Sequence, residues 1–218
     1  MTTFPNSPRL LKGGIVLIDP DTSAVRRIIV LQYNPDTLSR TLQPQAVKES
    51  GDRSEAMRLT GPPVETIKLD AEIDATDQLE FPEQNRTAVE FGIQPQLAAL
   101  EMIVYPASSQ LLANNSMAQA GMLEILPMMS ALPLFIWSKS RIVPVRITDF
   151  SVTEEAFDPA LNPIRAKVSL GMRVLSVTDL GFDNKGGSLF MAYQQLKEQL
   201  AAKSGSGAFS VLGIGGIS

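Results

Sequence analysis

Strict alternation of apolar and polar residues between Ile164 and Val174 limits what this chain can fold into more than any other feature. Successive side chains of a β-strand point to opposite faces, so the pattern predicts a strand with one buried and one solvent-facing side. A shift of one residue would exchange the two faces, and the register of this strand is therefore firmly set. The apolar face holds Ile164, Ala166, Val168, Leu170, Met172 and Val174, and the polar face holds Arg165, Lys167, Ser169, Gly171 and Arg173.

This strand belongs to a predicted long β-hairpin that runs from Leu134 to Thr178. The first arm, Leu134–Val152, is rich in β-branched and aromatic residues, which favour strands. The second arm is Ile164–Val177. Between the arms, the segment Thr153–Pro163 contains an Asp-Pro and an Asn-Pro pair, which are typical of loops.

A second hairpin is predicted near the N-terminus. Two apolar runs, Gly13–Ile18 and Arg26–Tyr33, flank the turn signal Asp19-Pro20-Asp21. The stretch Ile28–Leu31 is apolar on both faces, so we expect this strand to be covered on both sides or to lie in an interface. A further short strand is expected over Leu38–Leu42.

A charged strand follows a long polar segment. Lys48–Pro63 contains glycine and charges of both signs, and we expect a long loop there. Alternation resumes after Val64. The apolar face holds Ile67, Leu69, Ala71 and Ile73, and the polar face holds Thr66, Lys68, Asp70, Glu72 and Asp74. Because this polar face is acidic and that of Ile164–Val177 is basic, the two should attract if they meet across strands or between subunits.

Two helices are predicted in the second half of the chain. One begins near Pro95, presents Leu97, Leu100 and Val104 on one stripe and ends before Pro106. The other runs from an N-cap at Ser188 to Lys203. Its apolar stripe consists of Leu189, Tyr193, Leu196 and Leu200.

The remaining segments set the domain organisation. Residues 107–131 form an insertion, either a helix or an irregular arm. Residues 1–203 are expected to be one domain, followed by a glycine-rich tail, Ser204–Ser218. The fold class is then α+β: one mainly antiparallel sheet, open or closed into a barrel, with one or two helices packed on it.

Composition weighs against an enzyme. The chain of 218 residues has a net charge of -4 and contains neither cysteine nor histidine. These absences remove disulfides, thiolate chemistry, the commonest metal ligand and the usual general base at neutral pH. We expect no cofactor, no metal site and no nucleic-acid partner. The N-terminus lacks an apolar signal region, and Met102–Leu123 is uncharged but too polar to span a membrane, so we expect a protein made in the cytoplasm without membrane insertion.

Candidate catalytic groups have simpler explanations. Asp70, Glu72 and Asp74 share one strand face, but their straight spacing separates them by roughly 7 Å per step, whereas cation sites wrap a loop around the ion. Glu154, Glu155 and Asp158 fall in the expected loop, where solvation explains them. Ser138-Lys139-Ser140 fits a turn between strands, and Trp137 fits a core or an interface.

Several stretches together resemble one protein family. They are QYNPDTLSRTL, ETIKLDAEIDATDQLE, QPQLAALEMIVYP and the long run from LPLFIW to GMRVL. Over about residues 13–178 they resemble the contractile injection system tube-type domain, found in baseplate tube-initiator or adaptor proteins of phage-tail-like particles. The motifs that carry the resemblance are YNP at Tyr33–Pro35, the run at Leu69–Asp77 and FDPALNPIRA at Phe157–Ala166.

The resemblance implies a tail-tube fold, which is a β-barrel-like sandwich with a flanking helix, and a hexameric ring around a central channel. Such a ring joins the spike–hub to the inner tube and initiates tube assembly, with baseplate and sheath proteins as further partners. Many members carry a C-terminal LysM-type module, for which Ser204–Ser218 is too short. Glycan binding is therefore not carried over to this chain.

Ten residues are candidate interface positions. The charged ones should face the channel or a neighbouring subunit, and the apolar ones should dock a tail that is mobile in the free protein and ordered in the particle. They are Asp70, Glu72, Asp74, Arg165, Lys167, Arg173, Phe209, Val211, Leu212 and Ile214. A cell-wall carbohydrate-binding module, a small hydrolase, and another layer of the same tube are the alternative functions.

Overall fold

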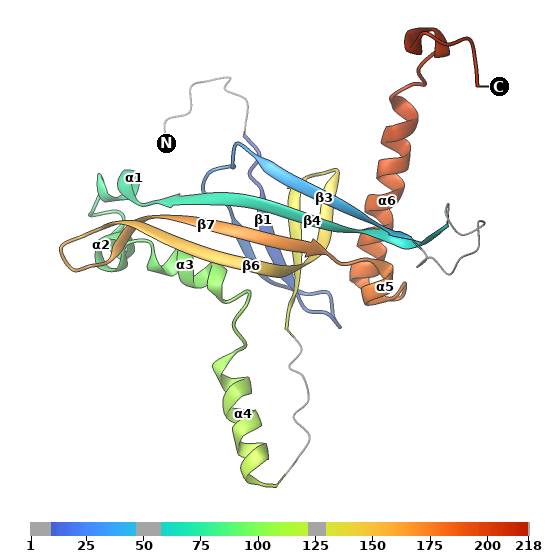
Figure 1. The fold of residues 1–218 in the computed structure, drawn as a ribbon. Helices are drawn as coiled ribbons and strands as arrows, with labels where there is room; N and C mark the ends of the chain where they lie inside the picture. The colour runs from blue at the N-terminus through green and yellow to red at the C-terminus, as the bar shows by residue number, and fades with distance from the viewer. Residues whose placement is uncertain (1–9, 47–57, 122–129, 218) are drawn as a thin grey trace.

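One seven-stranded antiparallel sheet, flanked by helices, forms the body of the molecule (Figure 1). The structure is a computed structural model that describes residues 10–46, 58–121 and 130–217. The strands are β1 (Gly14–Ile18), β2 (Val25–Val30), β3 (Leu38–Ala46), β4 (Leu59–Asp74), β5 (Leu132–Ser138), β6 (Arg141–Phe157) and β7 (Pro163–Val174). The helices are α1 (Thr76–Leu79), α2 (Arg86–Phe91), α3 (Gln94–Glu101), α4 (Ser108–Gln119), α5 (Val177–Leu180), α6 (Lys185–Lys203) and the 3₁₀ turn η2 (Phe209–Leu212). The α+β class expected from the sequence is confirmed.

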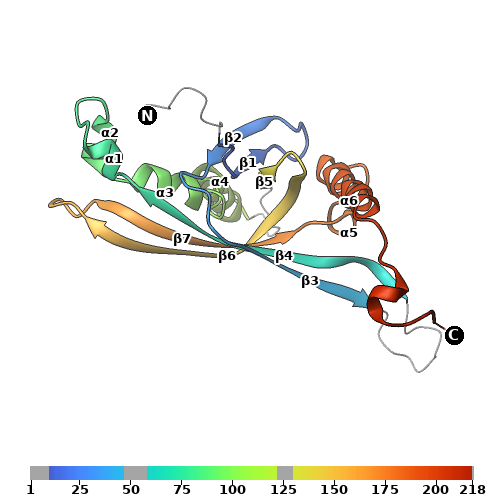
Figure 2. The same ribbon diagram turned by 90° about the horizontal axis from the view of Figure 1, so that it is seen from above.

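Strand β6 belongs to both halves of the sheet. The strand order is β2-β1-β5-β6-β7-β4-β3, and β6 pairs with β5 up to Pro144 and with β7 from Val145 onward. The sheet therefore folds over on itself, and Figure 2 shows its two halves facing each other at an angle. Within the described residues, β2 and β3 are the two end strands and do not pair. The described strands thus form one folded, open sheet.

The predicted long hairpin is present as β6 and β7, with three differences in its limits. Its expected first arm is two strands, because β5 turns into β6 at Lys139 and Ser140. Strand β6 continues to Phe157, so most of the expected loop Thr153–Pro163 is strand; the loop prediction failed there because the pairing with β7 extends to Pro163. Strand β7 ends at Val174, because Ser176 caps α5.

The N-terminal hairpin and the β3–β4 pair are also present. Strand β3 extends to Ala46, past the expected end at Leu42, and β4 already begins at Leu59. The prediction of a loop to Pro63 is therefore wrong at its end, because Gln43–Ala46 of β3 pair with that part of β4 through two register shifts. Residues 48–57 of the expected loop lie outside the described residues.

The core lies between the two halves of the sheet, where α3 and α6 close it. The alternation that the sequence shows is obeyed: Ile67 of β4 and Val168 of β7 are completely buried, and both lie in the main apolar cluster. Leu97 and Leu100 of α3 join that cluster. These side chains come from segments about 100 residues apart, so the core joins the whole domain.

The helix limits differ from those expected. Helix α3 carries Pro95 in its first turn, as predicted, but ends at Glu101, so Val104 lies beyond it and is half-exposed. Helix α6 begins at Lys185 rather than at Ser188, and its N-cap is Asn184, whose Oδ1 accepts a hydrogen bond from the backbone N–H of Gly186 at 2.8 Å.

The buried face of α6 is rotated relative to the predicted stripe. Phe190 and Tyr193 are buried, whereas Leu200 is exposed and Leu189 and Leu196 are only partly covered. Gly187 lets the start of the helix approach Gly181, whose carbonyl oxygen would lie 1.9 Å from an added Cβ. The rotation brings Lys197 toward the sheet, where it contacts Glu65 of β4.

The insertion contains helix α4, which extends away from the body as an arm (Figure 1). The helical alternative is confirmed for Ser108–Gln119, none of whose residues is buried. Residues 122–129 of the insertion lie outside the described part of the chain. Among the described residues, no helix combines the length and apolar composition needed to cross a membrane.

Candidate interface surfaces

The outward face of β4 and β7 carries all six charged candidate residues, which we call the charged ladder: Asp70, Glu72, Asp74, Arg165, Lys167 and Arg173. The antiparallel register places Asp74 opposite Arg165 and Glu72 opposite Lys167. None of the six is buried. Opposite charges that the sequence predicted to attract therefore meet across two strands of the same chain.

Two contacts of the ladder are short hydrogen bonds, and the ion pairs of Lys167 between them are longer. Arg165 Nε donates to Asp74 Oδ2 at 2.7 Å, and Ser169 Oγ donates to Asp70 Oδ1 at 2.6 Å. Lys167 Nζ lies 4.0 Å from Glu72 Oε1 and 3.5 Å from Glu155 Oε1. Glu155 thus belongs to the strand face, although the sequence had placed it in a loop.

Asp74 is the most strongly held carboxylate of the ladder. Partial burial raises the pKa of Asp74. Hydrogen bonds from Thr76 and Arg165 lower it by more, so the pKa lies below its ordinary value. The hydrogen bond to Asp74 in turn raises the pKa of Arg165. Both groups are consequently charged at neutral pH, and the pair contributes fixed opposite charges to this end of the face.

Arg173 stands apart from the acidic residues. It lies opposite Thr66 of β4 and Arg146 of β6, and its Nη2 donates to Asp179 Oδ1 of α5 at 2.7 Å. The other carboxylate oxygen of Asp179 accepts the backbone N–H of Ser176 and completes the capping box of α5. Arg173 therefore ties the end of β7 to α5.

The ladder is a mixed-charge polar surface, and four of its residues line a pocket of about 320 Å³ together with Tyr33 and Glu155. Its carboxylates point outward along one strand, and each of them has its own partner. Within residues 10–46, 58–121 and 130–217, no three acidic side chains converge as metal ligands would. Lys167, about half-exposed, keeps much of its surface available for contact with water or another molecule. Contact with a neighbouring subunit stays a prediction.

The most constrained charged cluster was missed by the sequence reasoning. Glu65 of β4 is 3% exposed and shares the buried face of the strand with Ile67, and its partners come from β3 and α6. Its carboxylate accepts hydrogen bonds from Arg40 Nε at 2.8 Å, Tyr193 Oη at 3.0 Å and Lys197 Nζ at 2.9 Å. Lys197 also lies 4.0 Å from the centre of the Tyr193 ring, a cation–π contact.

This cluster explains why α6 is rotated from its predicted stripe. A buried carboxylate needs charged partners, and Lys197 supplies one from the helix. Burial raises the pKa of Glu65, but hydrogen bonds from Lys197 and Arg40 outweigh it and leave the pKa below its ordinary value. The signal was available in the sequence, because Glu65 shares the parity of Ile67 and Leu69.

The tip of the β6–β7 hairpin is tightly organised. Hydrogen bonds from the side chain and backbone of Asn162 hold the pKa of Asp158 below its ordinary value. Asn162 Nδ2 also lies 3.1 Å from the carbonyl oxygen of Glu90, and the N–H of Ile93 donates to the carbonyl of Pro163 at 2.8 Å. The FDPALNP motif therefore docks the hairpin on the segment between α2 and α3.

Gly92 makes that docking possible. Its φ of +58° lies in the left-handed region, and an added Cβ would stand 2.1 Å from the carbonyl oxygen of Pro163. Any larger residue would separate the hairpin tip from α2 and α3.

Trp137 and the Ser138–Ser140 segment have structural roles. The Trp137 ring stacks on Phe135 with 6.0 Å between ring centres. The Oγ atoms of Ser138 and Ser140 lie 2.8 Å apart within the turn from β5 to β6. Both positions agree with the turn and core interpretations of the sequence.

Among the described residues, exposed apolar side chains gather on the tail, on the arm α4 and on strand β2. The tail exposes all four of its candidate residues, with exposed fractions of 48% for Phe209, 83% for Val211, 72% for Leu212 and 44% for Ile214. The arm α4 has no charged residue and exposes Leu111, Leu112 and Met117. Strand β2 exposes Ile28 and Val30, so it is covered on one face only. The docking of these surfaces stays a prediction.

Comparisons with known proteins show no family for this chain. No family model matches it, and no curated protein matches it. One solved structure that it is similar to is described as the tail of an empty GTA particle with C6 symmetry, at 14% identity and a TM-score of 0.29. The match covers 75% of this chain and 90% of that one, and at this TM-score it carries no weight for fold or function.

Proposed function

We propose that this chain is a structural subunit of a contractile injection system, a phage-tail-like particle. In this role six copies form a ring that adapts the spike–hub to the inner tube and initiates tube assembly. The proposal draws on the sequence motifs of residues 13–178, which resemble the tube-type domain. The FDPALNP motif docks the tip of the long β6–β7 hairpin on the segment between α2 and α3, which agrees with a rigid subunit of that type.

The observation that carries the proposal is the distribution of uncovered apolar surface. The tail, the arm α4 and the edge strand β2 lie on different sides of the body (Figures 1 and 2). Large exposed apolar patches on soluble proteins mark interaction sites. One small ligand could not cover three surfaces that face different directions, whereas neighbours within a ring and in the layers above and below it could.

The proposed role requires no catalysis. The chain lacks histidine and cysteine, and the described acidic residues of the ladder are engaged with basic or hydroxyl partners. We therefore propose that it is not an enzyme and that its work is done by its interfaces.

Mass measurement of the full-length protein tests the proposal. The chain would be purified alone and after co-expression with candidate inner-tube and spike–hub proteins, and its mass followed by light scattering. We expect a species with the mass of six 23.6 kDa chains, and six-fold rings by electron microscopy. A protein that stays monomeric under both conditions and binds or hydrolyses cell-wall glycan would replace the structural role with one of the alternatives.

A further inference from the structure

The two end strands of the sheet are built differently. Strand β3 carries Pro44 and two register shifts, at Gln43/Gln45 and Gln45/Ala46. Proline and bulges are devices by which edge strands avoid pairing with other chains. Strand β2, with the sequence VRRIIV, has no proline and exposes apolar side chains. The β3 edge is therefore protected from further pairing at Gln43–Ala46. On β2 the register shift and the two arginines lie at the start of the strand, Val25–Arg27, so the edge at Ile28–Val30 carries no such protection.

The backbone of β2 has groups available for one more strand. Leu31 donates its N–H to the carbonyl oxygen of Gly13 at 2.9 Å, on the β1 side. Because antiparallel pairing alternates along a strand, Ile28 and Val30 direct their N–H and C=O groups to the open edge. Their side chains are 65% and 56% exposed, whereas Ile29 and Leu31 are buried on the opposite face.

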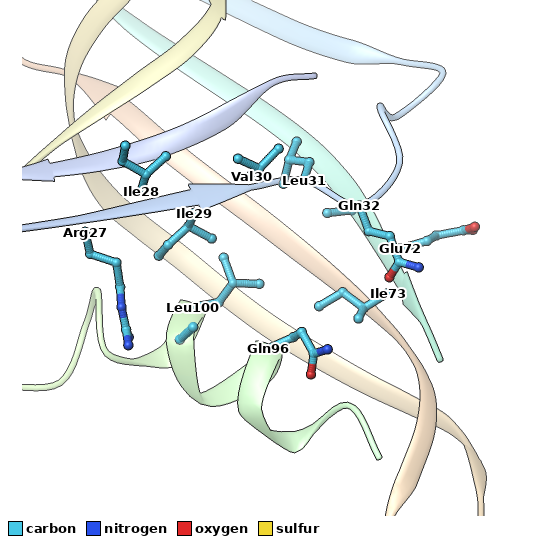
Figure 3. A pocket seen from close by; sticks show the side chains of 12 residues that line it. Arg27, Ile28, Ile29, Val30, Leu31, Gln32, Glu72, Ile73, Gln96 and Leu100 are labelled. Atoms are coloured by element: carbon cyan, nitrogen blue, oxygen red, sulfur yellow. The ribbon is translucent and has the colours of Figure 1, made fainter. Parts of the chain in front are cut away.

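A pocket of about 240 Å³ runs along this edge, between β2, α3 and the end of β4 (Figure 3). All residues from Arg27 to Gln32 line it, so the pocket faces the edge of the strand. In Figure 3, Ile29 points toward Leu100 of α3, and Ile28 and Val30 point to the other face. Gln96 Oε1 is buried in its wall and finds no hydrogen-bond donor among the described residues.

A strand added here would need apolar side chains on both faces and a length of about six residues, like that of β2. The pocket is lined mostly by apolar residues, and Arg27 and Glu72 are its charged ones. One face would extend the exposed surface of Ile28 and Val30, and the other would enter the pocket. The tail segment Phe209–Ile214 meets both conditions. If extended, it would present Phe209 and Val211 on one face and Leu212 and Ile214 on the other. It contains no charged residue, and its six residues equal the length of β2.

We propose that Phe209–Ile214 of one copy adds as an eighth strand to the open edge of β2 in a second copy. Figure 2 shows the tail beyond α6, on the side away from β2, so a different copy provides the edge. The Glu65 cluster holds α6 in that direction. A backbone N–H of the docked tail would supply the donor that Gln96 Oε1 lacks. This inference deepens the proposed function, on which it rests for the meeting of copies, and names the contact between them.

Disulfide trapping tests the contact, because the native chain has no cysteine. Full-length Ile28→Cys protein is mixed with full-length Val211→Cys or Leu212→Cys protein, oxidised mildly, and examined for the mixed dimer. Across a hydrogen-bonded strand pair facing Cβ atoms lie about 4.5–5.5 Å apart, and a small shift of the exposed edge brings them to the roughly 3.5–4.5 Å of a disulfide. We expect a mixed dimer with one of the two tail variants and much less with the other, since alternate residues of a strand face opposite sides.

The control places the cysteine on the protected edge, as Leu42→Cys of β3, which is exposed to a similar degree as the tail residues Phe209 and Ile214. It should give no mixed dimer with either tail variant. Equal trapping by Leu42→Cys, or no mixed dimer with Ile28→Cys, would overturn the proposal. A dimer of Ile28→Cys with itself would show that two β2 strands pair instead. Six-fold rings that form without the tail contact would leave the proposed function standing and remove this inference alone.

Discussion

At the scale of single residues, Glu65 has the largest consequence for the molecule. It is a carboxylate on the apolar face of a strand, and three donors from β3 and α6 surround it. A buried charge is tolerated only when its partners are in place, so the cluster fixes the rotation of α6. Through α6 it also fixes the direction in which the tail leaves the body.

Replacing this charge should destabilise the fold. Glu65→Gln keeps the shape but removes the ionic partner of Arg40 and Lys197, whose side chains are only about one-third exposed. We expect a loss of about 1–3 kcal/mol in the free energy of unfolding, or roughly 3–9 °C in Tm. Thermal unfolding followed by circular dichroism measures it. Glu72→Gln, on the outward face of the same strand, is the matched control and should change stability by less than about 0.5 kcal/mol.

The same residue predicts a dependence of stability on pH. The folded pKa of Glu65 lies below its ordinary value of 4.5, so the unfolded chain binds the proton more tightly. The stabilisation is complete above the unfolded pKa and is lost as pH falls through the folded pKa. Tm should therefore fall on acidification below about pH 4.5 more steeply in the native protein than in Glu65→Gln. Parallel curves for the two proteins would contradict the assignment.

At the scale of elements, β7 decides whether the sheet forms. Val168 is completely buried at its centre, opposite Val152 of β6 and Ala71 of β4. The strands on either side of β7, β4 and β6, contribute side chains to the same buried face. The core between the two halves of the sheet therefore includes this face.

A carboxylate at that position should abolish folding. In Val168→Asp the charge would have no partner within the core, and burying it costs several kcal/mol, comparable with the whole stability of a domain. Solubility and circular dichroism of the purified variant test this. Thr153→Asp is the control: Thr153 is exposed and lies opposite Lys167, so the new carboxylate should be tolerated. A Val168→Asp protein with native stability would contradict the face assignment.

We expect the tail to contribute little to the stability of the free protein. Its four apolar candidate residues are between 44% and 83% exposed, so deletion from Ser204 onward should leave the Tm of the free protein nearly unchanged. Incorporation into particles should fail, because ordering the glycine-rich tail needs apolar surface supplied by a partner. Deletion from Lys197 onward is the contrasting variant and should lower the Tm, because it also removes a donor to Glu65. A drop of several degrees for the shorter deletion would assign the tail to the core.

At the scale of the whole molecule, the charged ladder and the apolar surfaces predict different responses to salt. The ladder is exposed, so contacts that it makes with a neighbour would be screened with a Debye length of about 8 Å at physiological salt. Ring assembly, followed by sedimentation at low and high salt, should weaken as salt rises. Assembly that does not change with salt would remove this role from the ladder, and assembly that strengthens would favour the apolar contacts.

The sequence by itself determined which faces of β4 and β7 are buried, because strand parity depends only on neighbouring residues. Val168 and Ile67 are examples, and the opposing charges of the two polar faces could be recognised in the same way. The hairpins and the α+β class also followed from local patterns, whereas the arm was left open between a helix and an irregular segment until the structure showed helix α4. The candidate tail residues could be identified from composition, since an apolar, glycine-rich segment has little reason to stay in water.

Tertiary structure alone decided where strands end and what covers each face. Glu154 became part of a strand because Ala166 of β7 pairs with it, and Leu59 became part of a strand because Ala46 of β3 pairs with it. Glu65 could be buried only because α6 brought Tyr193 and Lys197 to it from about 130 residues away along the chain. Ile28 remained uncovered because β2 is the end strand of the sheet. Pairing and burial are set by contacts between distant segments, which no local pattern contains.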